Sequence, residues 1–131
     1  MYRANPEGIN IRAALLYWLL TLGYMAVIFL LSSYQGRDLP TLPENFDKVV
    51  HTGVYIPLAF LFYLSLRKSG IRKYIFITAF LFASLYGITD EIHQIFVPGR
   101  DAAIGDALAD FTGALLGCLG ASFWRYSSGD L

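Results

Sequence analysis

The chain has 131 residues, of which 56% are hydrophobic and only 15% are charged, with ten basic and ten acidic side chains and a net charge of zero. A soluble domain of this length exposes a large share of its surface and could not hide so much apolar area, whereas a membrane protein presents it to lipid. The balanced charge and the lack of a basic run argue against a nucleic-acid partner. The single cysteine, Cys118, excludes a disulfide within the chain.

Long apolar stretches predict transmembrane helices. The first contains nineteen residues without a charge, which span about 28 Å as a helix, close to the thickness of the hydrocarbon core. A cleaved signal peptide is the competing interpretation, but its apolar region would be shorter. The expected spans are 13–31, 49–66, 74–97 and 102–124. We therefore expect an all-α protein, a single membrane domain over 1–131 built as an up-down four-helix bundle.

The basic residues predict the orientation of this bundle. With four spans, the two terminal tails and the second loop lie on one side of the membrane. That side holds seven of the ten basic residues: Arg3, Arg12, Arg67, Lys68, Arg72, Lys73 and Arg125. The positive-inside rule then places both termini in the cytoplasm and the polar ends of the second, third and fourth helices near the outer face.

Polar residues form stripes at those three helix ends. Asp47, His51 and Tyr55 are spaced by four residues, as are Tyr86, Asp90 and Gln94, so each set shares one helix face. Such ionisable groups are costly within a bilayer, which makes them a functional-site hypothesis. The members of this expected site are Asp47, Lys48, His51, Tyr55, Tyr86, Asp90, Glu91, Gln94, Arg100, Asp106 and Asp110.

Small residues continue the face of Asp106 and Asp110 on the fourth helix. Gly113 and Gly117 follow at the same four-residue spacing, and such a ridge lets helices approach closely. The two carboxylates should therefore point into the bundle. The ridge could also form the interface of a homo-oligomer, although packing within the bundle is the preferred interpretation.

The acidic cluster leaves three chemical interpretations open. A histidine oriented by a carboxylate can deprotonate a hydroxyl or a water, while Arg100 and Lys48 hold a phosphate. A divalent cation could bind some of Asp47, His51, Asp90, Glu91 and His93, but no common metal-ligand spacing supports this, and we assign no metal ligands. The third interpretation is a pocket that binds a cationic or zwitterionic head group without chemistry.

Three segments together resemble the VanZ-like family of small bacterial membrane proteins, named for a teicoplanin-resistance accessory protein. They are DKVVHTGVYIPLAFLFY at 47–63, YGITDEIHQIFVPGRDA at 86–102 and DALADFTGALLG at 106–117. The last departs from the family, which often has Asn where this chain has Asp110. The resemblance implies a multi-pass protein of the bacterial inner membrane, near enzymes that act on lipid or lipid-carrier head groups. By position it carries Asp47, His51, Asp90, Glu91, Gln94, Arg100 and Asp106 over to the polar site.

We accordingly expect acid–base chemistry on the phosphoester head group of a membrane lipid or lipid-linked precursor at the outer face. In this hypothesis His51 is the general base, Asp47 orients it, and Asp90 and Glu91 supply acid–base or cation-binding groups. The remaining site residues bind substrate. The alternative is a non-catalytic envelope factor that binds lipid, wall precursor or glycopeptide antibiotic and contributes to resistance. A third interpretation is an assembly subunit whose polar cluster only holds the helices together.

Overall fold

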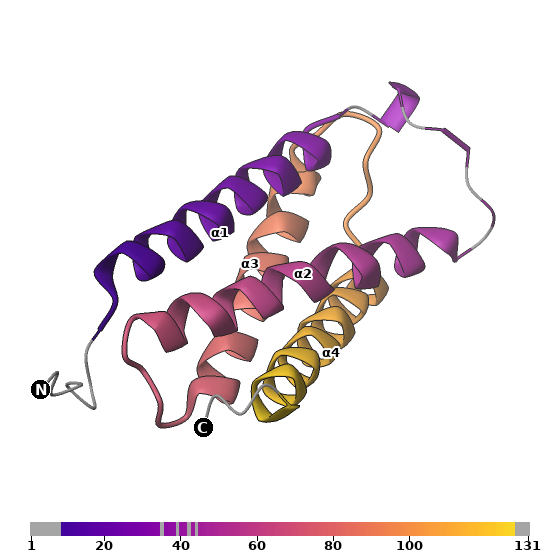
Figure 1. The fold of residues 1–131 in the computed structure, drawn as a ribbon. Coiled ribbons are helices and arrows are strands. Elements are labelled where there is room, and N and C mark those ends of the chain that lie inside the picture. The colour runs from indigo at the N-terminus through magenta and orange to yellow at the C-terminus, as the bar shows by residue number, and fades with distance from the viewer. Residues whose placement is uncertain (1–8, 35, 39, 42, 44, 128–131) are drawn as a thin grey trace, which may run out of the picture.

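The computed structural model describes residues 9–34, 36–38, 40–41, 43 and 45–127. It contains four long helices that run alternately up and down, and the described residues form no strand (Figure 1). These are α1 (Ile11–Ser32), α2 (Phe46–Lys68), α3 (Ile75–Ile95) and α4 (Ile104–Ser127), with a short 3-10 helix η1 (Gly36–Asp38) between the first two. Each long helix is apolar and long enough to cross a membrane. The expected all-α fold with four spans is confirmed.

The connection between α3 and α4 is longer than the sequence pattern predicts. The third span was expected to continue to Val97 and the fourth to begin at 102, but α3 ends at Ile95 and α4 begins at Ile104. Pro98 disfavours a helical conformation in the residue before it. Gly99 follows with a φ of 73°, a left-handed conformation that glycine adopts without strain. The resulting loop carries Arg100 and Asp101 across the end of the bundle.

The α2–α4 interface is the most extensive in the bundle and depends on two glycines. A Cβ atom at Gly113 would overlap the backbone carbonyl of Thr52, and one at Gly117 would overlap that of Ile56. Absence of these side chains allows the two helix backbones to touch, as in other close membrane-helix pairs. The expected ridge therefore serves packing inside this bundle, and the homo-oligomer remains an untested prediction.

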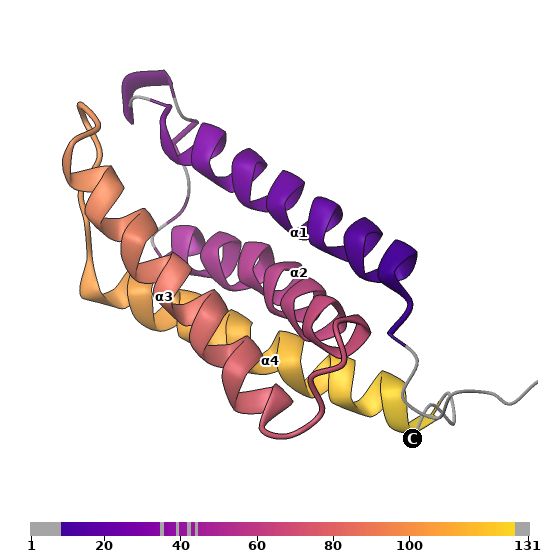
Figure 2. The ribbon, with the colours of Figure 1, turned by 90° about the vertical axis from the view of Figure 1, so that its left-hand side faces the viewer.

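Helix α1 lies on the outside of the α2–α3–α4 unit (Figure 2). It is attached to α2 by hydrogen bonds from Trp18 Nε1 to Ser69 Oγ at 2.8 Å and from the Tyr24 hydroxyl to the Val54 carbonyl at 2.6 Å. Most of its large apolar side chains are exposed, which is expected where lipid covers them. Helix α1 is therefore the most peripheral of the four, since it packs mainly on α2.

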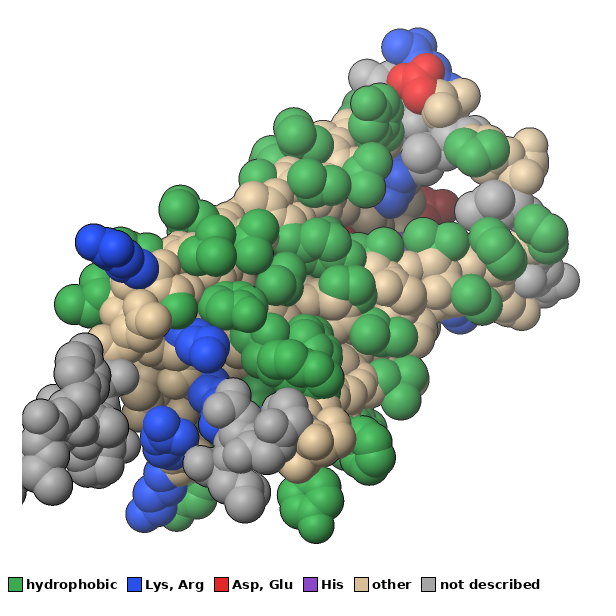
Figure 3. Space-filling view, in the orientation of Figure 1, with side chains coloured by type: hydrophobic (Ala, Val, Ile, Leu, Met, Phe, Trp, Pro, Cys, Tyr) green, Lys and Arg blue, Asp and Glu red, His purple; other side chains and the backbone are tan. Residues whose placement is uncertain are grey.

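Basic side chains gather at the end of the bundle where α2 turns into α3 (Figure 3). Of the seven residues expected on the cytoplasmic side, the structure describes six; Arg3 lies outside the described residues. These six lie at the ends of helices or in the turn that face away from the polar stripes. The arrangement agrees with the predicted charge asymmetry, while the direction of the termini stays a prediction.

Candidate functional site

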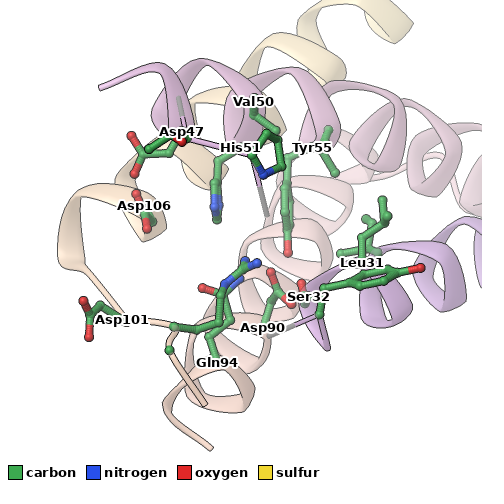
Figure 4. A pocket seen from close by; sticks show the side chains of 17 residues that line it. Leu31, Ser32, Asp47, Val50, His51, Tyr55, Asp90, Gln94, Asp101 and Asp106 are labelled. Atoms are coloured by element: carbon green, nitrogen blue, oxygen red, sulfur yellow. The ribbon is translucent and has the colours of Figure 1, made fainter. Parts of the chain in front are cut away.

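A cavity of about 620 Å³ opens at the end of the bundle opposite the basic turn. The C-terminal ends of α1 and α3, the N-terminal end of α2, the first turn of α4 and parts of both loops at this end surround it (Figure 4). Figure 3 shows the hollow between α1 and α2, with acidic and basic side chains inside it. Its polar wall consists of Ser32, Tyr34, Thr41, Asp47, His51, Tyr55, Asp90, Gln94, Arg100, Asp101 and Asp106.

The polar stripe of α2 lines one wall, as its spacing predicts. Asp47 lies at the mouth with its side chain half exposed, His51 follows one turn deeper, and Tyr55 is buried at the base (Figure 4). Tyr55 lies nine residues after the start of α2, about 13 Å along the helix axis. The stripe therefore carries polar groups from the helix end well into the span.

The stripe of α3 is only partly in the cavity. Asp90 and Gln94 line it and are both buried. The Tyr86 hydroxyl instead donates a hydrogen bond to the Met25 carbonyl of α1 at 2.6 Å, so Tyr86 does not line the wall. His93, one helix turn from Asp90, lies beside Ser33 Oγ at 2.9 Å and stacks on a phenylalanine of α1. Both residues fasten α1 to α3.

The carboxylate that holds His51 comes from α4. Nδ1 of His51 lies 2.9 Å from Oδ1 of Asp110 and 3.7 Å from Oε1 of Glu91. Asp47, which was expected to orient the imidazole, instead pairs with Lys48 at 3.6 Å. Asp110 replaces Asp47 as the orienting partner because α2 and α4 touch along their backbones, whereas Asp47 lies a full turn away on the same helix. The second ring nitrogen of His51, Nε2, makes no hydrogen bond among the described residues and is left for the cavity.

Glycine in α3 makes room for this pair. An added Cβ at Gly87 would lie 2.9 Å from Cβ of Asp110 and 3.1 Å from its Oδ2. Any larger residue would push against the carboxylate that holds His51. Glu91 is fixed separately, since its Oε2 accepts a hydrogen bond from the backbone N–H of Ala103 just before α4, at 3.2 Å. Glu91 and Asp110 thus form a layer behind His51 rather than the cavity wall itself.

This layer contains buried oxygens that the described residues do not satisfy. Within the described part of the chain, Glu91 Oε1, Asp110 Oδ2 and the adjacent hydroxyl of Tyr55 at the base of the cavity are buried and have no hydrogen-bond partner. Buried polar atoms are rarely left unpaired, so protons, water or a bound ligand complete this region. One ligand atom each from His51, Glu91 and Asp110 lie within 4.8 Å of one another, so a divalent cation could be held there. Of the residues expected to bind a cation, only His51 and Glu91 belong to this group.

The two basic residues of the expected site separate into different roles. Lys48 Nζ lies 3.4 Å from Asp106 Oδ1, and its stem passes close to Gly105, where an added Cβ would come within 2.8 Å of Lys48 Cε. Lys48 therefore links the starts of α2 and α4 and is not part of the cavity wall. Arg100 does line the cavity, and the described residues give it no ion pair. It is the guanidinium available to an anionic group.

The contribution of α1 was missed from the sequence. Ile28, Leu31 and Ser32 line the cavity, and Ser32 faces the carboxyl of Asp90. The first apolar run suggested only a span, because it contains no ionisable residue. One signal was present: the run ends at Leu31 and the polar Ser32 follows at the same end of the bundle as the other polar groups.

Comparison with known proteins agrees with the fold and with the motifs around the cavity. A family model described as VanZ/LLP1 matches residues 15–125, which include α2, α3, most of α1 and α4, and every residue of the expected site. No curated protein and no solved structure matches the chain significantly. Because the family model matches most of the sequence, this four-helix chain belongs to the VanZ/LLP1 family.

Proposed function

We propose that this protein acts by acid–base chemistry on the phosphoester head group of a phospholipid or lipid-linked carrier at the outer face of the membrane. The observation that carries the proposal is the pair of His51 and Asp110, with Nδ1 and Oδ1 2.9 Å apart and the imidazole on the wall of the cavity. A buried carboxylate on one ring nitrogen orients a histidine so that the other nitrogen can accept a proton. The concentration of basic residues at the opposite end of the bundle supports an outward-facing cavity.

The cavity wall is suited to an amphiphilic substrate. Ile28, Leu31, Val50 and Val54 make an apolar surface where α1 meets α2, and the polar side chains face them. A lipid can keep its hydrocarbon chains against such a surface while its head group enters the polar part. Arg100 would bind the phosphate through its planar fork of N–H groups, a geometry that suits phosphate oxygens.

The proposed reaction needs no residue outside this wall and the layer behind it. A water molecule bonds to phosphorus, and the bond from phosphorus to the leaving alcohol oxygen breaks. Nε2 of His51 takes the proton from the water and returns it to the leaving oxygen. Asp110 holds the imidazole throughout, Glu91 positions the start of α4, and the side chains of Asp90, Gln94 and Asp106 contact the head group.

The decisive experiment is mass spectrometry of whole-cell lipids and lipid carriers. A deletion strain would carry the wild type, His51→Ala or an Asp38→Asn control at matched protein levels, Asp38 being an exposed residue of η1 away from the cavity. A lipid that accumulates in the deletion strain and with His51→Ala, and returns to normal with wild type and control, supports the enzyme. The purified protein must then cleave that lipid.

The same experiment separates the enzyme from a binding factor. A protein that only binds a lipid, a wall precursor or a glycopeptide changes envelope stress or drug access without changing any lipid. Unchanged lipids in all strains, together with an envelope phenotype that His51→Ala shares with the deletion, would contradict the proposed chemistry. If instead the protein carrying any cavity substitution is not found in the membrane at normal levels, the polar cluster serves assembly of the bundle.

A further inference from the structure

The cavity wall carries more negative than positive charge. Asp47, Asp90, Asp101 and Asp106 line it, and Arg100 is the basic residue of the same lining. Lys48, behind the wall, pairs with two of these acids, which leaves Asp90 and Asp101 without an ion pair among the described residues. Asp90 lies deep in the cavity beside the Ser32 hydroxyl and within electrostatic range of Arg100, and Asp101 lies at the mouth. A head group whose only charge is a phosphate would meet one cationic side chain and several carboxylates, so its negative charge would not be neutralised by the wall.

The base of the cavity brings together three side-chain oxygens that can accept hydrogen bonds, and the hydroxyl of Ser32 faces one of them, the carboxylate of Asp90. Tyr55 is 1% exposed and its hydroxyl has no hydrogen-bond partner among the described residues, and Figure 4 shows that hydroxyl directed toward Asp90. The carboxylate of Asp90 and the side-chain carbonyl of Gln94 lie on the same wall, and both residues are more than nine-tenths buried. An ammonium group has three N–H donors and no acceptor, which complements these three oxygens.

From this juxtaposition we propose that the cavity recognises a phosphate joined to a primary ammonium group, as in the head group of phosphatidylethanolamine. Asp90, Gln94 and Tyr55 receive the ammonium at the base, and Arg100 contacts the phosphate nearer the mouth. This inference rests on the proposed function only in placing a lipid head group in the cavity, and it does not require that any bond is broken.

The chemistry of the wall also excludes related head groups. A trimethylated ammonium, as in phosphatidylcholine, has a positive charge but no N–H to donate, so it cannot form hydrogen bonds with these oxygens. Recognition of such a group commonly uses a cage of aromatic faces, whereas tyrosines 34 and 55 are the aromatic residues of this lining. Phosphatidylglycerol has no cation and meets the carboxylates with its own negative charge.

Native mass spectrometry of the detergent-purified full chain tests the proposal with an equimolar mixture of the three lipids. We expect wild type to retain phosphatidylethanolamine over phosphatidylglycerol by roughly tenfold or more, the scale of a hydrogen bond to a charged group. Asp90→Asn should bring this ratio close to one, and Tyr55→Phe should lower it several-fold. Arg100→Gln should weaken retention of all three lipids, and the Asp38→Asn control should change nothing.

Further comparisons keep the test decisive. If Asp90→Asn does not yield a folded protein by circular dichroism, Tyr55→Phe, which keeps the ring, carries the test. Adding soluble O-phosphoethanolamine distinguishes its sources: competition shows that the head group suffices, and no competition shows that the lipid is required. Equal retention of phosphatidylglycerol and phosphatidylethanolamine by wild type would overturn the inference. Selective retention without turnover would refute the proposed reaction and leave the recognition intact.

Discussion

Replacing Gly117 by alanine tests whether backbone contact between α2 and α4 holds the bundle together. A Cβ atom there would overlap the carbonyl oxygen of Ile56 and lie 2.9 Å from Cβ of Ala59. A helix carbonyl cannot move aside alone, so the helices must separate, at a cost of about 1–3 kcal/mol typical of overpacking. The control is Gly120→Ala on the same helix, where the nearest atom is Phe60 Cδ2 at 3.9 Å.

The control should gain rather than lose stability. Alanine in a helix is more favourable than glycine by roughly 0.5–1 kcal/mol when nothing obstructs it. Because both single-methyl changes gain this helix propensity, they should differ in the free energy of unfolding by about 1–3 kcal/mol, the overpacking cost at Gly117. Unfolding by sodium dodecyl sulfate in mixed micelles, followed by circular dichroism, measures this difference. If Gly117→Ala is as stable as Gly120→Ala, the close packing described for α2 and α4 is wrong.

Four further predictions concern the site and its orientation. His51→Ala should lower turnover roughly 100-fold or more, and Asp110→Ala should produce most of that loss. Because the two side chains act as one unit, the double variant should be little worse than His51→Ala. Additive losses in the double variant would contradict the pairing. Asp47→Asn should reduce turnover by less than about fivefold, because its ion pair with Lys48 is partly exposed; a loss as large as that of His51→Ala would restore it as the orienting residue. Removing divalent cations with EDTA should leave turnover unchanged, whereas loss with recovery on adding Zn²⁺ or Mn²⁺ would assign a metal to the histidine–carboxylate layer. The predicted topology places Asp38 at the outer face of the membrane. In a chain that keeps Cys118, Asp38→Cys should therefore react with a membrane-impermeant maleimide in intact spheroplasts. Labelling only after lysis would reverse the predicted topology.

The sequence predicts features that depend on one helix at a time. Long, predominantly apolar runs identify all four spans, because the length needed to cross the bilayer is fixed. Spacing by four residues correctly places Asp47, His51 and Tyr55 along one wall, since that periodicity belongs to the helix itself. The same logic places Asp90 and Gln94 together. The ends of the loop between α3 and α4 were harder to predict, because Pro98 indicates a break in the helix without fixing which residue ends α3.

Contacts between helices could not be predicted in the same way. The partner of His51 depends on how far α4 slides and rotates against α2, and that is set by where two glycines meet the carbonyls of the facing helix. The sequence therefore predicts that Asp110 binds substrate, whereas in the structure it holds the imidazole of His51. Tyr86 shares a face with Asp90, yet its long side chain reaches past the cavity to α1. Spacing within a helix predicts which face of the helix a side chain lies on, but not which group on a neighbouring helix it contacts.

The peripheral helix α1 contributes only uncharged side chains to the cavity. All ionisable groups of the cavity wall come from α2, α3, α4 and the loops, whereas α1 contributes two aliphatic side chains and the hydroxyl of Ser32. Substitution of Ile28 or Leu31 can therefore change which hydrocarbon fits beside the cavity without altering any charge within it. If the cavity binds a lipid as we propose, such replacements would change the hydrocarbon tails that it accepts while the charged groups on α2, α3, α4 and the loops stay the same, and Val50 and Val54 of α2 would complete the apolar surface.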